Sequence, residues 1–392
     1  MKKTILIIVI IGVVIFFVLG LFRGPHEDMG GEQYTSKWGF IDKSGAIIIA
    51  PGFSGAGEFS QGLCPVISGG KYGFINKKGE TVIKPRFDWA SNFQNGLARV
   101  KIDGKWGFID TAGNTAVQPV FDALGDFSEG QAPAESGGKW GFIDRSGNDA
   151  IKPEFDRAYN FFGDLAGVNI NGKWGFIDGT GRQAIKPEYD WIKSFSEGLA
   201  AVTAGDKTGY IDRSGKMVIS PRFDDAGDFR DGLGRVSTGG KWGYIDKSGK
   251  AVIEPKFEQA LDFSEGLAPV REGGKWGYID KSGKYAVSPG FEEGRDFSGG
   301  IAVVKTGGKY GVIDRSGNFI AGPGFDEVRD SSEDLIAVKS GGKWGFIDKA
   351  GKAVIEPEFD FAANFSDGIA GIRVNQKGKE QGDPGGPDQG KD

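Results

Sequence analysis

The chain has 392 residues, of which 39% are hydrophobic and 26% charged, and its formal net charge is −5. It contains a single histidine, His26, and a single cysteine, Cys64. These counts exclude a multi-histidine metal site and an intrachain disulfide framework, and they argue against a Ser/His/Asp or Cys/His nucleophile system. The composition therefore predicts a protein without a cofactor and without enzyme activity.

The N-terminus carries an unbroken run of 18 apolar or glycine residues, residues 5–22, between Lys2, Lys3 and Arg23. At ~1.5 Å per residue this run makes a helix of ~27 Å, close to the ~30 Å hydrocarbon core of a bilayer. We predict one transmembrane helix, a signal anchor within residues 1–23. The alternative is a signal peptide cleaved after Gly20, which would make the protein secreted.

The charges beside this run predict its orientation in the membrane. Lys2 and Lys3 favour a cytoplasmic N-terminus, so the rest of the chain would be exported. Without Lys2, Lys3 and Arg23, the remaining 45 basic and 53 acidic side chains give a net charge of −8. An acidic exported body is a poor nucleic-acid binder, so we expect contact with the membrane through residues 5–22 and none with nucleic acid.

Glycine is the compositional outlier, and the repeats explain it. The chain holds 68 glycines, about 17%, which is more than twice the usual ~7%. A Lys-aromatic-Gly tripeptide recurs every 34 residues, with Lys207-Thr208-Gly209 as the one departure. Ten repeats cover residues 37–376, after a linker at residues 24–36 and before a polar tail at 377–392 that we expect to be disordered. They start at residues 37, 71, 105, 139, 173, 207, 241, 275, 309 and 343.

Each repeat contains three strand-length runs between turn signals. Around the eighth copy these are residues 267–270, 275–280 and 285–288, joined by Gly273-Gly274 and by residues 280–283. Glycine supplies the positive φ that such hairpin turns need. The pattern predicts an all-β fold of ten three-stranded antiparallel meanders.

The residues after the third strand are expected to return the chain to the next repeat. Proline cannot donate to a β-ladder, so Pro289 and its equivalents are expected to end that strand. Phe257, Ala260 and Phe263 recur at spacings of three, which indicates a tight turn or a single helical turn. This segment is predicted to pack over a sheet edge.

Alternation in the central strand places Trp276 and Tyr278 on one face and Gly277 and Ile279 on the other. Because both faces carry apolar groups, each sheet is expected to stack on the neighbouring repeats. Gly277 is expected to leave room for an aromatic ring. Residues 368–372 could complete the first sheet, which favours a closed propeller-like ring, while an open β-superhelix is the alternative.

The string Lys-Trp-Gly-Phe-Ile-Asp-Lys-Ser-Gly-Lys-x-Val-Ile-x-Pro-x-Phe-Asp, followed by Phe-Ser-Glu-Gly-Leu-Ala-x-Val, resembles the WG (KWG) repeat of bacterial proteins. The resemblance implies a β-rich repeat array, often in surface or secreted bacterial proteins, and no particular activity. This agrees with the location predicted from the N-terminal run, with the repeats outside the bacterial cytoplasmic membrane and attached to it by a single-pass anchor. The departures from the motif are Tyr72, Thr208 and Tyr310 for the Trp, Ser331 for the second Phe, and Asp164 and Asp334 for the Gly.

Two groups of tryptophans are candidates for different roles. Seven belong to the repeat motif and are expected in the structural core, with sugar stacking as the alternative: Trp38, Trp106, Trp140, Trp174, Trp242, Trp276 and Trp344. Trp89 and Trp191 instead occupy a variable position that five other copies fill with charged or polar residues. An aromatic residue there is expected to be exposed and to contact a ligand.

Charged residues at two other variable positions complete the predicted binding surface. They follow the repeat proline, at Arg86, Arg222 and Lys256, or the last valine position, at Lys101, Arg271 and Lys305. One turn aspartate per repeat, such as Asp42, supplies too few ligands for calcium and is expected to bond its own turn amides. A second acidic row, which includes Asp224, is expected to cap the return segment.

These observations predict a membrane-anchored extracytoplasmic binding or scaffolding protein. The expected ligand is an envelope protein, and an envelope polysaccharide is the alternative. A glycan hydrolase is the rival from another class. Its chemistry needs one unequal carboxylate pair in a cleft, whereas the acidic rows here recur in nearly every repeat.

Overall fold

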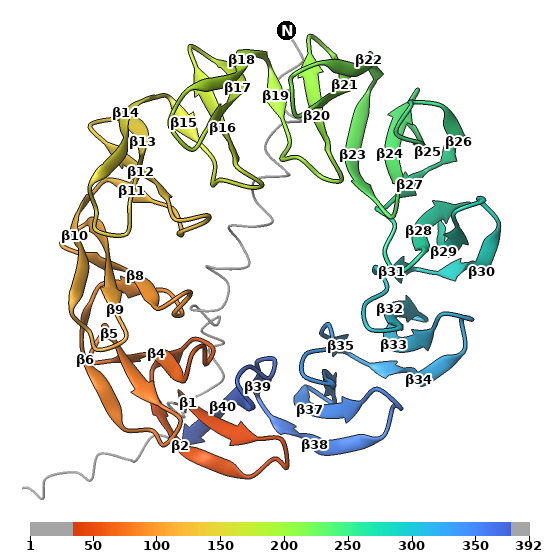
Figure 1. Cartoon of the computed structure of the whole chain (residues 1–392). Coiled ribbons are helices and arrows are strands. Elements are labelled where there is room, and N and C mark those ends of the chain that lie inside the picture. The colour runs from red at the N-terminus through yellow and green to blue at the C-terminus, as the bar shows by residue number, and fades with distance from the viewer. Residues whose placement is uncertain (1–33, 378–392) are drawn as a thin grey trace, which may run out of the picture.

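The computed structural model describes residues 34–377, which form forty strands and no helix. The strands make ten four-stranded antiparallel sheets, here called blades, arranged in a ring (Figure 1). The chain is therefore a ten-bladed β-propeller. The predicted transmembrane helix lies outside the described residues, and within residues 34–377 no helix could cross a membrane.

Each blade runs from an inner strand, which is two residues long except in blade 7, to an outer edge strand (Figure 1). Blade 1 consists of β39 (Phe361–Ala362), β40 (Ile369–Lys377), β1 (Tyr34–Asp42) and β2 (Ile47–Phe53). Blades 2 to 5 are, in the same order, β3 (Gly55–Ala56), β4 (Leu63–Ser68), β5 (Lys71–Asn76), β6 (Thr81–Phe87); β7 (Trp89–Ala90), β8 (Leu97–Ile102), β9 (Lys105–Asp110), β10 (Thr115–Phe121); β11 (Ala123–Leu124), β12 (Ala132–Ser136), β13 (Lys139–Ile143), β14 (Asp149–Phe155); and β15 (Arg157–Ala158), β16 (Leu165–Ile170), β17 (Lys173–Asp178), β18 (Gln183–Tyr189).

The second half of the ring repeats this pattern. Blades 6 to 10 are β19 (Trp191–Ile192), β20 (Leu199–Ala204), β21 (Lys207–Asp212), β22 (Met217–Phe223); β23 (Asp225–Arg230), β24 (Leu233–Thr238), β25 (Lys241–Ile245), β26 (Ala251–Phe257); β27 (Gln259–Ala260), β28 (Leu267–Glu272), β29 (Lys275–Asp280), β30 (Tyr285–Phe291); β31 (Glu293–Gly294), β32 (Ile301–Thr306), β33 (Lys309–Asp314), β34 (Phe319–Phe325); and β35 (Glu327–Val328), β36 (Leu335–Ser340), β37 (Lys343–Asp348), β38 (Ala353–Phe359).

The three strands predicted for each repeat are present, but the return segment adds a fourth. Its two residues, such as Gln259–Ala260, pair with the end of the next strand, so the predicted helical turn is wrong. The proline prediction is also wrong, because Pro289 lies inside β30. That strand is the outer edge of its blade, where a missing N–H leaves no neighbour unpaired. A proline also protects such an edge against pairing with another chain.

The invariant glycine of the motif makes room for backbone rather than for an aromatic ring. A Cβ placed on Gly243 would lie 2.4 Å from the Ile253 carbonyl oxygen and 2.6 Å from the Pro255 nitrogen. The pairing of β25 with β26 is irregular at this point, which brings the two strands close together. The invariant glycine and the invariant proline therefore lie against each other where the two strands approach.

The hydrophobic core lies between the blades, as the sequence predicts. Phe74 and Ile83 of blade 2 pack against Phe93 and Val100 of blade 3, and all four are buried. Equivalent clusters fill the other joins of the ring. Each blade is therefore stabilised by its two neighbours, as expected for a repeat protein.

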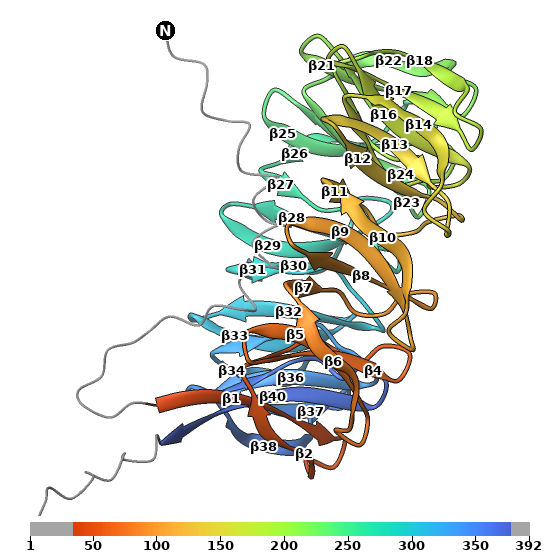
Figure 2. The same ribbon diagram turned by 90° about the vertical axis from the view of Figure 1, so that its left-hand side faces the viewer.

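The ring is closed, because β1 and β40 pair over nine residues within blade 1. The contacts across this join repeat those inside the ring. Ser366 Oγ donates to the Phe59 carbonyl over 2.6 Å, as Ser196 Oγ donates to the Phe229 carbonyl over 2.7 Å. Figure 2 shows the paired ends of β1 and β40 projecting together from the ring. The open superhelix is thereby excluded.

Candidate functional site

Strand register gathers several predicted site residues at the same end of every blade. In blade 3, Trp89 lies opposite Lys101, Lys101 opposite Trp106, and Trp106 opposite Phe121. Equivalent rows cross the other blades beside the turn that joins the second and third strands. Trp191, Arg271 and Lys305 occupy the same rows in blades 6, 8 and 9.

The cations of these rows are engaged within the protein. Lys101 Nζ lies 5.2 Å from the centre of the Trp106 ring. Lys305 Nζ lies 3.0 Å from Glu293 Oε1, and Arg271 Nε lies 3.9 Å from Glu258 Oε2. Each of the three cations is half-buried. Each of these cations therefore already has a partner within its own blade.

Arg86, Arg222 and Lys256 lie apart from these rows, on the outer strands. The guanidinium of Arg86 donates to the Gly113 carbonyl over 2.6 Å, and that of Arg222 donates to the Gly249 carbonyl over 2.5 Å. Lys256 Nζ lies 5.0 Å from the centre of the Phe257 ring. The two arginines therefore hold neighbouring blades together.

The motif tryptophans are packed in place to different degrees. Trp38, Trp174 and Trp344 are buried, whereas Trp106, Trp140, Trp242 and Trp276 are half-buried. Arginine side chains cover three of the rings. The Cζ atoms of Arg99, Arg235 and Arg329 lie 5.2, 4.9 and 4.8 Å from the ring centres of Trp106, Trp242 and Trp344. These contacts disfavour the covered rings as open platforms for sugars.

Both acidic rows serve the turns. The Asp42 carboxylate accepts the amides of Ser44 and Ala46, as predicted for the first row, and the hydrogen bonds from Ser44 hold its pKa low. In the second row, Asp224 accepts Lys207 Nζ over 2.6 Å and the amide of Gly239 over 2.6 Å. It therefore caps the glycine turn of its blade rather than the return segment.

The bond from Lys207 is also the main cause of the low pKa of Asp224. Equivalent lysine–aspartate pairs recur at six other motif lysines: Lys71, Lys105, Lys139, Lys173, Lys309 and Lys343. Across residues 34–377, no three acidic, cysteine or histidine side chains are placed to hold a metal ion. The lone thiol, Cys64, is buried, and burial raises its pKa.

Trp89 and Trp191 differ although they are equivalent in sequence. Trp89 is half-buried, with its ring centre 5.1 Å from that of Trp106 and 6.5 Å from that of Tyr72. Trp191 is 42% exposed. Blade 6 carries Thr208 where the other copies have an aromatic residue, so no motif ring of that blade covers Trp191. Exposure is therefore as predicted for Trp191 but wrong for Trp89.

Two further exposed aromatic residues, Tyr159 and Phe162, lie in blade 5, and Tyr159 contacts Trp191. Tyr159 is 38% exposed and stacks on Trp174, with ring centres 4.5 Å apart, and its ring centre is 6.5 Å from that of Trp191. Phe162 is 60% exposed and lines a small pocket together with Tyr159 and Lys193. We call Tyr159, Phe162 and Trp191 the aromatic patch. It spans blades 5 and 6.

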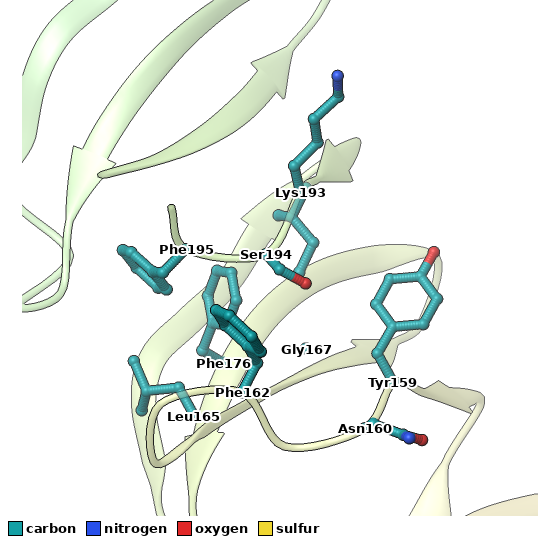
Figure 3. Close-up of a pocket in the computed structure, with 10 residues that line it drawn as sticks. Tyr159, Asn160, Phe162, Leu165, Gly167, Phe176, Lys193, Ser194 and Phe195 are labelled. Carbon is teal, nitrogen blue, oxygen red and sulfur yellow. The ribbon is translucent and has the colours of Figure 1, made fainter. Parts of the chain in front are cut away.

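The local fold explains how these side chains are presented. Tyr159 and Phe162 lie on one loop, and Lys193, which points away from the pocket, lies on a neighbouring loop (Figure 3). Gly167 makes space for the tyrosine, since a Cβ there would lie 3.1 Å from the Tyr159 ring. The sequence analysis missed Tyr159 and Phe162. A signal was present, because most other copies have small or polar residues at these two positions.

Comparison with known proteins identifies the repeat. The family model described as "WG containing repeat" matches ten consecutive segments: residues 38–72, 72–106, 106–140, 140–174, 174–207, 209–242, 242–276, 276–310, 310–344 and 344–377. No curated protein matches the chain.

Solved structures align with this chain at low sequence identity. A eukaryotic initiation factor aligns at a TM-score of 0.50 and 11% identity, covering 88% of this chain and 98% of that chain. Two others align less closely. PorZ, a surface component of the type-IX secretion system of Porphyromonas gingivalis, gives a TM-score of 0.27 at 13% identity, with coverages of 79% and 52%. Hsv2p of Kluyveromyces lactis gives 0.35 at 9% identity, with coverages of 57% and 92%. The first likeness shows the fold alone.

Proposed function

The chain belongs to the WG repeat family, and from this premise we propose that it is a binding or scaffolding protein built on a ten-bladed β-propeller. We further propose that a protein of the cell envelope is its ligand. An envelope polysaccharide is the second candidate. The ring would be held outside the cytoplasmic membrane by residues 5–22.

The aromatic patch is the observation that carries this proposal. Ten similar repeats need only the shared residues to fold, so departures that place large rings in solvent call for another explanation. Tyr159, Phe162 and Trp191 are such departures: Tyr159 contacts Trp191, and it lines a pocket together with Phe162. Tyrosine and tryptophan are enriched at the energetic centres of protein interfaces, and exposed apolar patches mark such sites.

The polysaccharide alternative depends on Trp191 as a stacking platform. Its ring is inclined at 69° to that of Trp174, with the ring centres 5.9 Å apart, so the two rings are not stacked face to face. Trp89 is less suited to this role because it is wedged beside two other aromatic rings. The hydrolase receives no support from the acidic rows, whose carboxylates are engaged by turn amides and lysines.

The test is affinity capture from an envelope extract with the full chain in detergent, measured for protein and for carbohydrate. Phe162→Ala and Trp191→Ala should abolish saturable capture of a protein. Val120→Ala is the matched control, because Val120 is 59% exposed but lies on an outer strand. Equal capture by all variants would refute the patch as the site, and capture of carbohydrate alone would establish the alternative.

The proposed location has a separate test. Protease added to intact spheroplasts should digest the repeats if they lie outside the membrane. Full protection of the repeats, under conditions in which a known exported protein is cleaved, would overturn the exported orientation.

A further inference from the structure

Aromatic pairs lie across the joins between blades, and one join lacks its pair. At nine joins a ring from a central strand meets a ring from the return segment of the next blade, with centres 4.7 to 5.1 Å apart. Tyr278 and Phe297 form the pair between blades 8 and 9. The equivalent residues between blades 9 and 10 are Val312 and Ser331. Both rings are absent from this join.

A cleft of about 360 Å³ opens where the second ring is missing. Ser331 lines it, together with an apolar wall of Leu261, Ile301 and Val303. Ile301 and Val303 are buried members of the core between blades 9 and 10. This volume lies within the usual ~300–1,000 Å³ range of small-molecule sites, which are mostly apolar with a few placed polar groups.

The charged residues of the cleft leave one carboxylate without a partner. Arg295 Nη1 lies 3.0 Å from Asp330 Oδ1, so those two charges are paired. Within residues 34–377, Asp296 makes no hydrogen bond or ion pair. Partial burial, with a further contribution from the Asp262 charge, raises its pKa, and the charges of Arg230 and Arg235 only partly oppose this shift. A ligand with a positive charge would relieve this arrangement.

We propose that the cleft between blades 9 and 10 binds a small organic cation with an apolar body, such as an amine that carries an aryl group. The ring of the ligand takes the space of the missing aromatic side chain and packs on Leu261, Ile301 and Val303. Its ammonium group pairs with Asp296. The backbone of this loop is held in place, because the Tyr278 hydroxyl donates to the Arg295 carbonyl over 2.9 Å. The site is separate from the aromatic patch and does not depend on the function proposed for it.

Calorimetric titration of the full chain with 2-phenylethylammonium tests the proposal. Saturable binding is expected, and the uncharged analogue 2-phenylethanol should bind at least about tenfold more weakly. Ser331→Phe restores the residue of the other nine repeats and should abolish binding by filling the cleft. Asp296→Asn should weaken binding of the cation about tenfold or more without filling the cleft.

Asp228→Asn is the matched control, because Asp228 occupies the equivalent position two repeats earlier and lies outside the cleft. It should bind as the wild type does. Circular dichroism checks that each variant is folded. If Ser331→Phe does not fold, the binding measurement on Asp296→Asn tests the proposal. Absence of saturable binding, equal affinity for the two probes, or unchanged binding by Asp296→Asn would each overturn the proposal.

Discussion

Replacing Gly243 by alanine tests why the motif glycine never varies. Its φ is not positive, so the effect of a methyl group is steric. The added Cβ would lie 2.4 Å from the Ile253 carbonyl oxygen, whereas ordinary contacts begin at about 3.4 Å. The backbone of β26 would therefore have to move by about 1 Å. Overpacking typically costs ~1–3 kcal/mol, and we expect the upper end, about 3 kcal/mol, because backbone cannot rotate away.

The matched control is Gly322→Ala in β34, where a Cβ would have no neighbour within 4 Å. It should be neutral or should stabilise the protein by ~0.4–1 kcal/mol, through a less flexible unfolded chain. Urea unfolding, followed by both tryptophan fluorescence and circular dichroism, measures the difference. With an m-value of ~3 kcal/mol/M, Gly243→Ala should lower the midpoint by about 1 M. Equal midpoints for Gly243→Ala and wild type would refute the close-contact explanation.

Three further predictions follow from the packing and the ion pairs. Trp344→Ala should lower the free energy of unfolding by ~3–5 kcal/mol because the side chain is 3% exposed, and half-buried Trp276→Ala should cost less; equal losses would contradict the burial difference. Ser366→Ala and Ser196→Ala should each cost ~1 kcal/mol, since both remove the same bond between blades; an effect of Ser196→Ala alone in urea unfolding would show that the ring opens in solution. The turn carboxylates have lowered pKa values in the folded state, so they stabilise the fold above their unfolded pKa, and this stabilisation is lost as pH falls below about 4; an unchanged melting temperature between pH 7 and pH 3 would contradict this.

Much of the blade is predictable because it depends on local patterns. The 34-residue period, the hairpin turns and the alternation of Tyr278 and Ile279 follow from residues near one another in the chain. The short inner strand does not follow from such patterns, since residues Gln259–Ala260 form a strand only by pairing with β28. The position of Pro289 inside β30 likewise depends on that strand being an edge. Predictions fail where a neighbour in space decides the structure.

The same distinction applies to the candidate sites. The variable position of Trp191 predicts its exposure, but the burial of Trp89 depends on Tyr72 and Trp106, which only the strand register brings close. Departures such as Ser331 are visible in the sequence one at a time. Val312 and Ser331 become a single feature only when adjacent blades are placed against each other.

The strand pairing in blade 1 has a consequence for how the protein is made. This blade takes β1 and β2 from the start of the described chain and β39 and β40 from its end. Until β40 leaves the ribosome, β1 has only β2 as a partner, and a lone hairpin is marginally stable. The nine complete blades can fold as they emerge, whereas closure has to wait for β40, the last of the described strands. An incomplete chain would carry an unpaired edge strand throughout this time, which is the feature that most exposes a β protein to aggregation.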